Sequence, residues 1–552
     1  GMGIAGQPSG GPTDVAEVFS TGLHIGNATN TAITNGIDLA GEGGMVWVKS
    51  RTLTENHAIF DTERQGANWY LSSDSTAAEN QDTGNPMMVS FNSDGYTLGV
   101  NNFTNGYDPY VAWTFRNSKK FFKAVTFSYG GSSASPTVVT HDLGCTVGMT
   151  FVKQTNGTQN WYVQHKDVTG NDNNGALNLN IAFAGGNGQS TSFTSITDTQ
   201  ATFGAAASFP AGTYVAYFFA DNSSEDAEDQ MIKCGSYTGT AADLSINLGW
   251  EAQFVLVKNT SSARNWRMLD SMRGVATEGN AAILAPNSSD AEFNAPDFFR
   301  FNSLGFELDA SGGADVNSNG DSYIYMAIRA PMMVEPEAAT DVFHVNASQG
   351  NAGSPSFYST GFDVDMAITK RTDAVASHYN GSRLAGSGQF LRTENTNAED
   401  NGGPFLFDVS DGVTKTGGGG NGNDPYVTYM WKRAKGYMDV VAYKGTGSAM
   451  NLSHSLGAVP ELVIIKIRYY SPSPSYGGDK WYVYHKDLGI GSHIALQSAS
   501  AKVNQGFLSS LPTETNLPLQ NTSGDSLATV DSSTTYIAYL FATLAGISKV
   551  GS

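Results

Sequence analysis

The chain has 552 residues, a formal net charge of −20 and a pI of about 4.7, and only 15% of its residues are charged. This length exceeds what one hydrophobic core normally holds, so it predicts several domains. The acidic balance argues against nucleic acid as a partner, because phosphate binding requires a basic surface. No apolar run approaches the roughly 18 residues that a membrane-spanning helix needs, so we expect no membrane insertion.

The composition is typical of loop-rich all-β proteins, with 63 glycines and many Asn, Ser and Thr residues. Residues 1–17 are rich in Gly and Pro and predict a flexible arm. They have no basic or apolar region, so they do not resemble a secretory signal peptide. The two cysteines, Cys145 and Cys234, are too few for a disulfide framework, and we interpret them as buried thiols.

The dominant pattern of the chain is an internal repeat. A short apolar strand that ends in lysine recurs five times, at intervals of 104, 105, 112 and 96 residues, and a strand led by tyrosine follows each copy. Two anchors in constant order predict five copies of one module of about 100 residues. The lysines are Lys49, Lys153, Lys258, Lys370 and Lys466, and the tyrosines are Tyr110, Tyr214, Tyr323, Tyr426 and Tyr536.

We number the expected modules 1 to 5 in chain order; they span 18–119, 120–221, 230–331, 340–434 and 435–546. A longer period lies above this one. Module 4 repeats a motif of module 1 after 316 residues, and module 5 repeats a motif of module 2 after 320 residues. We therefore expect a unit of three modules followed by a unit of two. Residues 547–552 resemble the opening of module 3, and predict either the start of a sixth module or a strand that completes module 5.

Within a module the local pattern predicts β-strands. Short runs rich in Val, Thr and aromatic residues, such as Phe122–Tyr129, end at glycine clusters. The strand that begins at Tyr110 is apolar on both faces, and such a strand belongs in the middle of a sheet. The expected fold is all-β, with five tandem antiparallel β-sandwich modules of two sheets each.

Several motifs resemble those of tandem-repeat virion proteins from marine tailed bacteriophages, cyanophages included. The resemblance is carried by GMVWVKSR at 44–51, NWYVQHKD at 160–167 and YIAYLFA at 536–542, and it covers residues 18–552. Modules of that family are similar to jelly-roll sandwiches of the concanavalin A or laminin-G kind, and the proteins are often described as tail-fibre-like. The resemblance implies localisation at the surface of a virion.

The first functional hypothesis is a non-catalytic structural protein, a fibre or appendage component that binds host-surface glycans. Separate cores on short linkers would give it the shape of an extended rod or plate. The implied partners are other virion proteins, further copies of the chain in a homo-oligomer, and host cell-surface glycans. Two alternatives stay open: a head-decoration or tail-ornament protein that acts only in assembly, and a polysaccharide hydrolase on the tail. A hydrolase needs paired carboxyls, for which Glu63 and Glu394 are candidates, although both also fit solvated loop positions.

Aromatic residues at one register of the repeat form the candidate glycan-binding site. Exposed rings stack on sugars, whereas a tryptophan that recurs beside an apolar strand also fits a core position. His57 and His378 take the same register in modules 1 and 4. The candidate residues are Trp161, Tyr162, Trp266, Trp481 and Tyr482.

The His-Lys-Asp sequences at 165–167 and 485–487 offer a histidine beside a carboxylate, as a general base would need. Modules 1 and 3 have Asp61–Arg64 and Asp270–Arg273 in the equivalent place. Because this site tolerates a complete change of side-chain chemistry, we interpret it as a structural turn and assign no catalytic residue.

The sequence Asp315–Asp321 matches the first half of a calcium-binding loop, with oxygen-bearing side chains at alternate positions and a glycine at the sharp turn. The ligands would be Asp315, Asn317, Asn319 and Asp321. Met326 stands where such a loop has its bidentate glutamate, and an ordinary hairpin turn is the alternative. Calcium is the one cofactor that the sequence suggests.

Overall fold

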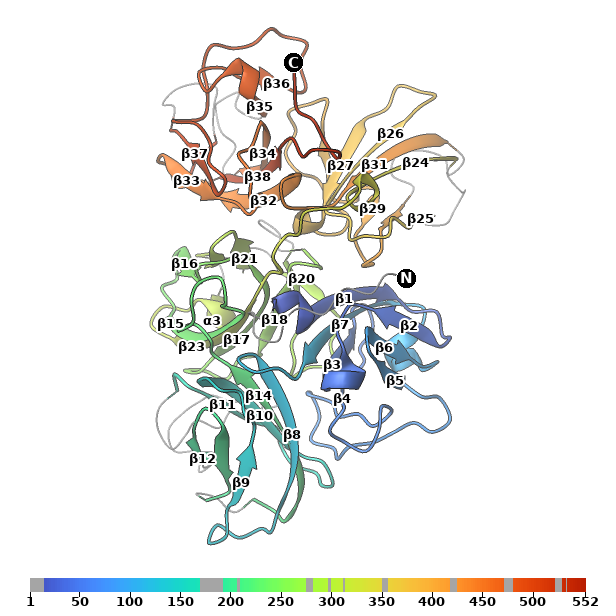
Figure 1. Cartoon of the computed structure of the whole chain (residues 1–552), viewed down its shortest axis with the longest axis vertical. Coiled ribbons are helices and arrows are strands. Elements are labelled where there is room, and N and C mark those ends of the chain that lie inside the picture. The colour runs from blue at the N-terminus through green and yellow to red at the C-terminus, as the bar shows by residue number, and fades with distance from the viewer. Residues whose placement is uncertain are drawn as a thin grey trace.

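The computed structural model is built almost entirely of β-strands. It describes residues 14–168, 192–205, 209–274, 281–295, 299–310, 313–349, 356–416, 424–470, 480–521, 529–532 and 534–552. Within these residues, each module has one large and one small antiparallel sheet, and module 3 has a further two-stranded sheet, β19-β20 (Figure 1). The expected all-β architecture of antiparallel sandwiches is confirmed. No helix in these ranges is long and apolar enough to cross a membrane.

Module 1 has the sheet pattern that recurs along the chain. Its strands are β1 (Phe19–Ile25), β2 (Thr31–Thr34), β3 (Gly44–Ser50), β4 (Ala58–Asp61), β5 (Met88–Asn92), β6 (Gly95–Leu98) and β7 (Pro109–Arg116). Its short helices are the 3-10 helix η1 (Val15–Glu17), α1 (Leu39–Glu42) and α2 (Asn102–Asn105). The large sheet has the order β1-β7-β3-β4, and the small sheet β2-β6-β5. The tyrosine strand β7 is therefore central, as predicted. Residues 1–13 of the expected arm lie outside the described residues.

Modules 2 and 3 repeat this order. Module 2 contains β8 (Phe122–Tyr129), β9 (Thr137–Thr140), β10 (Val147–Gln154), β11 (Tyr162–His165), β12 (Phe193–Ile196), β13 (Gln200–Phe203) and β14 (Gly212–Ala220). Module 3 contains β15 (Ile232–Thr238), β16 (Leu244–Asn247), β17 (Ala252–Asn259), β18 (Arg267–Asp270), β19 (Ala281–Ile283), β20 (Phe293–Ala295), β21 (Phe299–Asn302), β22 (Gly305–Leu308), α3 (Gly313–Val316) and β23 (Ser322–Arg329). Their large sheets are β11-β10-β14-β8 and β15-β23-β17-β18.

Modules 4 and 5 extend the large sheet by one short strand. Module 4 contains η2 (Ala339–Asp341), β24 (Phe343–Gln349), β25 (Ser356–Tyr358), β26 (Met366–Arg371), β27 (His378–Ser382), η3 (Arg383–Ala385), β28 (Leu391–Arg392), β29 (Phe405–Leu406), β30 (Val413–Lys415) and β31 (Pro425–Trp431). Module 5 contains β32 (Met438–Lys444), β33 (Met450–Ser453), β34 (Leu462–Tyr470), β35 (Trp481–His485), η4 (Lys486–Leu488), β36 (Ile494–Ala495), β37 (Asn516–Leu519) and β38 (Thr534–Phe541). Their large sheets are β24-β31-β26-β27-β28 and β32-β38-β34-β35-β36.

The repeated lysines are structural. The Lys49 ammonium is buried and donates to the backbone carbonyls of Ser50 and Leu53 at 2.8 and 3.1 Å. Lys153 and Lys258 make the same contact with the residue that follows each of them. Burial lowers the pKa of all three to about 8. In modules 1 to 3 each ammonium therefore fastens the end of the lysine strand, which explains why the residue recurs there.

The large sheet of module 1 is buried on both faces. On one face, Tyr110 and Ala112 of β7 pack with Tyr96 of the small sheet, and together they form the core of the sandwich. On the other face, Trp113 and Phe115 are equally buried, but they belong to a different cluster. The alternation along one strand thus separates a module's own core from its contacts with other modules.

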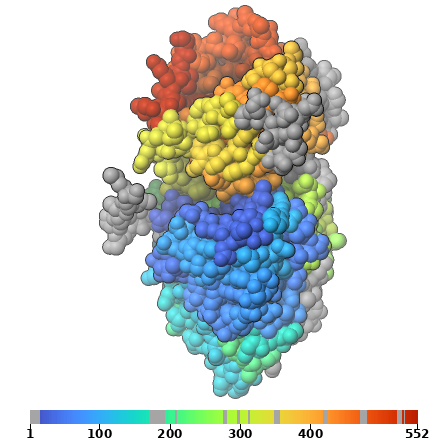
Figure 2. Space-filling model, turned by 90° about the vertical axis from the view of Figure 1, so that its right-hand side faces the viewer, coloured from blue at the N-terminus to red at the C-terminus, as the bar shows by residue number. Residues whose placement is uncertain are grey.

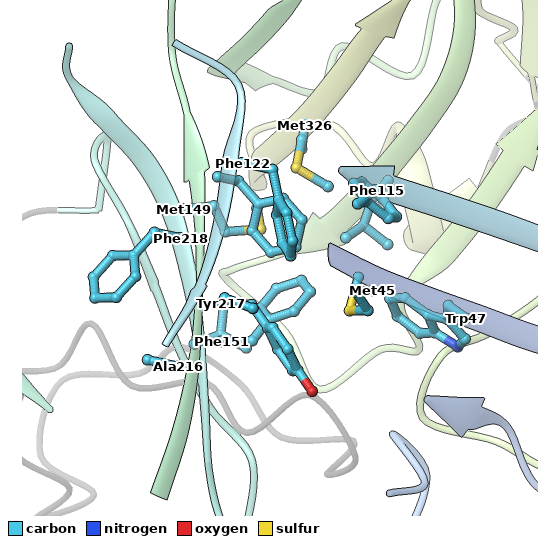
Figure 3. Packing of buried hydrophobic residues seen from close by; sticks show 14 of the residues in the cluster. Met45, Trp47, Phe115, Phe122, Met149, Phe151, Ala216, Tyr217, Phe218 and Met326 are labelled. Carbon is cyan, nitrogen blue, oxygen red and sulfur yellow. The ribbon is translucent and has the colours of Figure 1, made fainter. Parts of the chain in front are cut away.

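Modules 1, 2 and 3 pack the outer faces of their large sheets around one shared core. The ring of Trp47 lies 6.4 Å from that of Phe151 in module 2, and the ring of Trp113 lies 6.0 Å from that of Phe254 in module 3. Figure 3 labels both Trp47 and Phe151 among the buried residues of this core, with Met45 drawn between them. We call these three modules unit one. They form a closed ring and not the extended rod that separate cores would give, because the second apolar face of each sheet requires a neighbour.

Modules 4 and 5, which we call unit two, repeat the contact between modules 1 and 2 and rest on module 3. Arg433 of module 4 forms an ion pair of 2.8 Å with Glu251 of module 3. Figure 1 shows unit two at the top of the molecule and module 2 at the opposite end. In the view of Figure 2, module 4 lies directly above module 1.

The turns that join modules 1 to 2 and 4 to 5 are alike, and residues 544–548 make the same turn. Each turn is a reciprocal backbone bridge across four residues, formed by Ser118 with Phe122, Ala434 with Met438, and Leu544 with Ser548. Residues 547–552 add no strand to the sheets of module 5.

Candidate functional site

In modules 1 and 3 the turn after the fourth strand is held by a buried ion pair. Asp61 accepts from Nε of Arg64 at 2.6 Å, and Asp270 accepts from Nε of Arg273 at 2.7 Å. Each carboxylate also accepts the backbone N–H of its arginine. These side chains are 0–2% exposed. The pair closes the turn and neutralises two charges that would otherwise be costly to bury.

In modules 2 and 5 a histidine replaces this carboxylate. His165 and His485 stand at the register of Asp61, and Nδ1 of each accepts the backbone N–H two residues further on at 3.2 Å. The carboxylates of Asp167 and Asp487 are partly exposed beside the turn. The contacts are those of a turn, in agreement with the structural interpretation of the sequence.

Two histidines of unit one, His57 and His165, connect modules. Nε2 of His165 donates to the carbonyl of Tyr325 in module 3 at 3.1 Å, and burial lowers the pKa of His165 to about 4. His57 accepts from Nε1 of Trp47 at 2.9 Å and donates to the carbonyl of Ala285 in module 3 at 3.0 Å. Burial lowers the pKa of His57 to about 3. Both rings are neutral near pH 7, and both ring nitrogens of each are engaged, which leaves no free base.

The five aromatic residues predicted to bind glycans are buried. None has an exposed face on which a sugar could stack, so they occupy the core positions that were the alternative prediction. Trp161 and Trp481 lie on the second buried face of the large sheet, which carries them into contacts between modules. Tyr162 and Tyr482 lie in the cores of their own modules. The exposed fractions are 0% for Trp161, 9% for Tyr162, 0% for Trp266, 1% for Trp481 and 0% for Tyr482.

Two of these tryptophans bond across module boundaries. Nε1 of Trp161 donates to the carbonyl of Ser72 in module 1 at 2.9 Å. Nε1 of Trp481 donates to the carbonyl of Arg392 in module 4 at 2.9 Å. The register that the sequence identified is therefore a joint between successive modules.

The four residues predicted to bind calcium have protein partners or face solvent. Asp315 pairs with Arg267 at 2.5 Å, and Asp321 accepts from the side-chain amide of Asn259 at 2.8 Å. Asn317 is buried and donates to two backbone carbonyls, whereas Asn319 is exposed. Among the described residues, no three His, Cys, Asp or Glu side chains are grouped to hold a metal ion. Calcium binding by this loop stays a prediction.

The two candidate hydrolase carboxylates make local contacts in different modules. Glu63 accepts from the side-chain amide of Asn117 in module 1 at 3.2 Å. Glu394 accepts the backbone N–H of His378 in module 4 at 3.0 Å, and its pKa is lowered by hydrogen bonds that outweigh its partial burial. Neither contact resembles an acid and nucleophile pair across a cleft.

A polar pocket of about 420 Å³ lies where modules 1, 3 and 4 meet. Arg51 of module 1 crosses it, with ion pairs of 2.8 Å to Glu292 of module 3 and 2.6 Å to Asp408 of module 4. Arg273 also pairs with Glu292 at 3.0 Å. Burial alone would raise the pKa of Glu292, but the two guanidinium groups outweigh it and lower that pKa to about 2.

Sequence reasoning missed this charged junction. Arg51 is separated from Glu292 by 241 residues and from Asp408 by 357 residues, and nothing local marks the three as partners. The only available signal was the place of Arg51 two residues after a repeat lysine.

The fold and these contacts define a class: multi-module β-sandwich proteins whose recurrent polar residues join the modules. The chain belongs to the family described as domain of unknown function DUF7483, whose family model matches residues 14–331 and 338–552. The two matched stretches correspond to unit one and unit two. No curated protein and no solved structure matches the chain.

Proposed function

We propose that this chain is a non-catalytic structural component of a phage virion whose modules serve assembly with other virion proteins. The observation that carries the proposal is the use of the repeat's polar residues as joints. Asp61, His57 and His165, which could otherwise act as acids or bases, are buried and bonded across module boundaries. Catalytic groups normally face a cleft that substrate can enter.

The architecture suits a structural role. A large sheet that is covered on both faces has little freedom to move, and each module is held by apolar packing, hydrogen bonds and ion pairs at once. The setting in a virion is supported by the resemblance of the repeat motifs to tandem-repeat phage proteins.

Electron microscopy of particles from the source tests this proposal, with the chain located by a gold-labelled antibody raised against it. Label on a fibre or appendage supports a tail component, and label over the capsid supports a decoration protein. Absence of label from intact particles, with label on separately spread chain as the positive control, contradicts the proposal.

A second candidate function is the binding of host-surface glycans at the junction pocket. Guanidinium, carboxylate and amide groups line this pocket, and these are the groups that hydrogen-bond sugar hydroxyls. Binding of the full chain to immobilised host polysaccharide, lost in a Gln389→Ala and Thr52→Ala double variant, would support it. Equal binding by the unchanged chain and the double variant would show that the glycan does not bind in the junction pocket. Release of reducing sugar from the same polysaccharide would contradict the non-catalytic proposal.

A further inference from the structure

In unit one the same kind of contact between two strands occurs at each of the three module boundaries. The central strand of each module meets the fourth strand of the preceding one. The Tyr217 hydroxyl of module 2 donates to Asp61 of module 1 at 2.6 Å, and Nε1 of Trp113 in module 1 donates to Asp270 of module 3 at 3.1 Å. Between modules 3 and 2, the carbonyl of Tyr325 accepts from His165. The three contacts are heterologous, and together they close a ring of three.

Unit two contains one such contact. The hydroxyl of Tyr539 in module 5 donates to the side-chain oxygen of Asn380 in module 4 at 2.8 Å. Tyr539 and Tyr217 occupy the same register of the central strand. Modules 4 and 5 therefore stand to each other as modules 1 and 2 do, in two of the three positions of a ring.

Module 4 is exposed on the side that would face a third module. Tyr429 is 38% exposed, whereas the residues at its register in the other four modules are 0–2% exposed. Those four are Trp113, Tyr217, Met326 and Tyr539. Val345 on the first strand is 44% exposed, whereas its counterparts are 0–6% exposed. The counterparts of Val345 are Thr21, Ala124, Cys234 and Val440.

Module 5 is exposed on the opposite flank of the same position. Ile494 is 36% exposed, and its counterparts Leu71, Leu284 and Leu391 are 1–2% exposed. Leu496, two residues further on, is 47% exposed. Single exposed apolar residues are ordinary on a protein surface. These four are not scattered. Val345 pairs with Tyr429 across the sheet, and Trp113, the counterpart of Tyr429 in module 1, packs against Phe254 of module 3. Leu496 lies two residues from Ile494, whose described counterparts are buried in clusters that neighbouring modules share.

We propose that the position flanked by Val345, Tyr429, Ile494 and Leu496, which we call the open seat, binds a further sandwich module of the module 3 kind. Module 3 is the template because it fills the equivalent position against modules 1 and 2, the counterparts of modules 4 and 5. Its outer face brings apolar side chains such as Phe254 to the shared core.

Three polar groups specify this occupant. Tyr429 requires a carboxylate at the register of Asp270, since a tyrosine at this register already donates to the carboxylate of Asp61. His378, at the register of His57 and 45% exposed in its side chain, requires a carbonyl at the position of Ala285. His485 requires a carbonyl at the position of Tyr325, as His165 does. One module of the module 3 kind supplies all three. These apolar and polar features of the open seat do not depend on the proposed role in a virion.

The experiment compares the chain with an extended chain in which a copy of residues 237–331 follows Ser552. This register is chosen because Ser548–Ser552 align with Ile232–Ser236. Side-chain footprinting by hydroxyl radicals reports Tyr429 and Leu496, with Tyr539 as the buried internal standard. We expect labelling of both residues to fall by roughly an order of magnitude in the extended chain, to the level of Tyr539.

Variants of the extended chain identify the surface. Val345→Glu with Tyr429→Glu should restore the labelling of Leu496, because two carboxylates cannot be buried against an apolar sheet. Val375→Glu, also in module 4 but fully exposed, should change nothing.

Three outcomes would overturn the proposal. The first is an extended chain whose added module is folded while Tyr429 keeps its labelling. The second is an added module that stays unfolded, judged by amide hydrogen exchange, because module 3 itself folds in an equivalent seat. The third is a dimer of the unextended chain in light scattering that protects Tyr429, since a second copy would then be the occupant.

Discussion

The hydroxyl of Tyr217 in module 2 donates a 2.6 Å hydrogen bond to the carboxylate of Asp61 in module 1, and both side chains are buried. The same carboxylate holds Arg64 at 2.6 Å. One side chain thus closes a turn within its own module and connects that module to the next. This double use explains how a residue inside a repeat can also determine how the repeats are arranged.

Removal of Asp61 should be far more damaging than removal of the Tyr217 hydroxyl. Asp61→Ala removes the closest charged partner of the buried Arg64 guanidinium and leaves it only the 3.4 Å pair with Glu79, so it should destabilise unit one by about 3–5 kcal/mol. Tyr217→Phe loses one hydrogen bond to a charged group and should cost about 1.5–3 kcal/mol. Urea unfolding of the full chain measures both, compared as shifts in the transition of unit one because several modules do not unfold as one two-state system.

The control for these variants is an exposed ion pair. Lys120, the first residue of module 2, pairs at 2.8 Å with Glu225, which lies between modules 2 and 3, but their side chains are 47% and 25% exposed. Glu225→Gln should shift the transition by less than about 1 kcal/mol. Equal effects of Asp61→Ala and Glu225→Gln would show that the buried carboxylate does not hold the junction.

The tryptophan joints should behave as core residues. Trp161→Ala and Trp481→Ala each remove a large buried ring and a hydrogen bond to the neighbouring module, so each should cost about 3–5 kcal/mol. Trp161→Phe keeps most of the volume and should cost less than Trp161→Ala. Tyr107→Ala, at a residue 79% exposed, is the matched control and should be close to neutral. A stable Trp161→Ala and Trp481→Ala double variant that loses glycan binding would instead restore the platform hypothesis.

The sequence predicted the central strand well and the arrangement of modules poorly, for one physical reason. The strand from Tyr110 to Phe115 is apolar on both faces, which correctly indicates burial on both. The pattern does not say whether Trp113 faces another sheet of its own module or a different module, because both surroundings are equally apolar. The register of Trp161, Trp266 and Trp481 was visible for the same reason, whereas its role as a joint was not.

The sequence also did not predict ion pairs between residues that lie far apart in the chain. The turn from Asp61 to Arg64 is local, so its recurrence as Asp270 to Arg273 could be found by comparing modules. The pairing of Arg51 with Glu292 depends on how module 1 meets module 3, and no spacing along the chain encodes it.

Buried histidines should make the chain sensitive to mild acid. Burial lowers the pKa of His24, His57 and His165 to about 4, 3 and 4, below the 6.5 of an unfolded chain. Because the folded state disfavours protonation, their stabilising contribution is complete above pH 6.5 and is lost as the pH falls toward 4. At pH 5 each should have lost about 2 kcal/mol. Asp74, whose burial raises its pKa to about 6, acts in the opposite sense and offsets part of this loss.

The urea midpoint of unit one, measured from pH 7.5 to 4.5, tests the sign. It should fall as the pH is lowered, and His57→Gln with His165→Gln should flatten the dependence. His378→Gln, at the equivalent but exposed position of module 4, is the matched control and should leave the urea midpoint of unit one unchanged. A midpoint that rises between pH 6.5 and 4.5 would contradict the prediction.

Arg51 should hold unit two against unit one. Its guanidinium lies between Glu292 of module 3 and Asp408 of module 4, and its side chain is 8% exposed. Arg51→Ala leaves Asp408 without this partner in a buried junction, whereas Glu292 keeps Arg273. The variant should weaken the contact between the two units and not the fold of each module, because the substitution does not change the pairing of strands within any sheet. We expect faster proteolysis in the linker at 332–339 and a larger maximum dimension in small-angle X-ray scattering.

Arg371→Ala, which removes ion pairs confined to module 4, should change neither measurement. If Arg51→Ala instead lowers the unfolding midpoint of unit one without altering the shape of the molecule, the arginine stabilises module 1 and does not join the units.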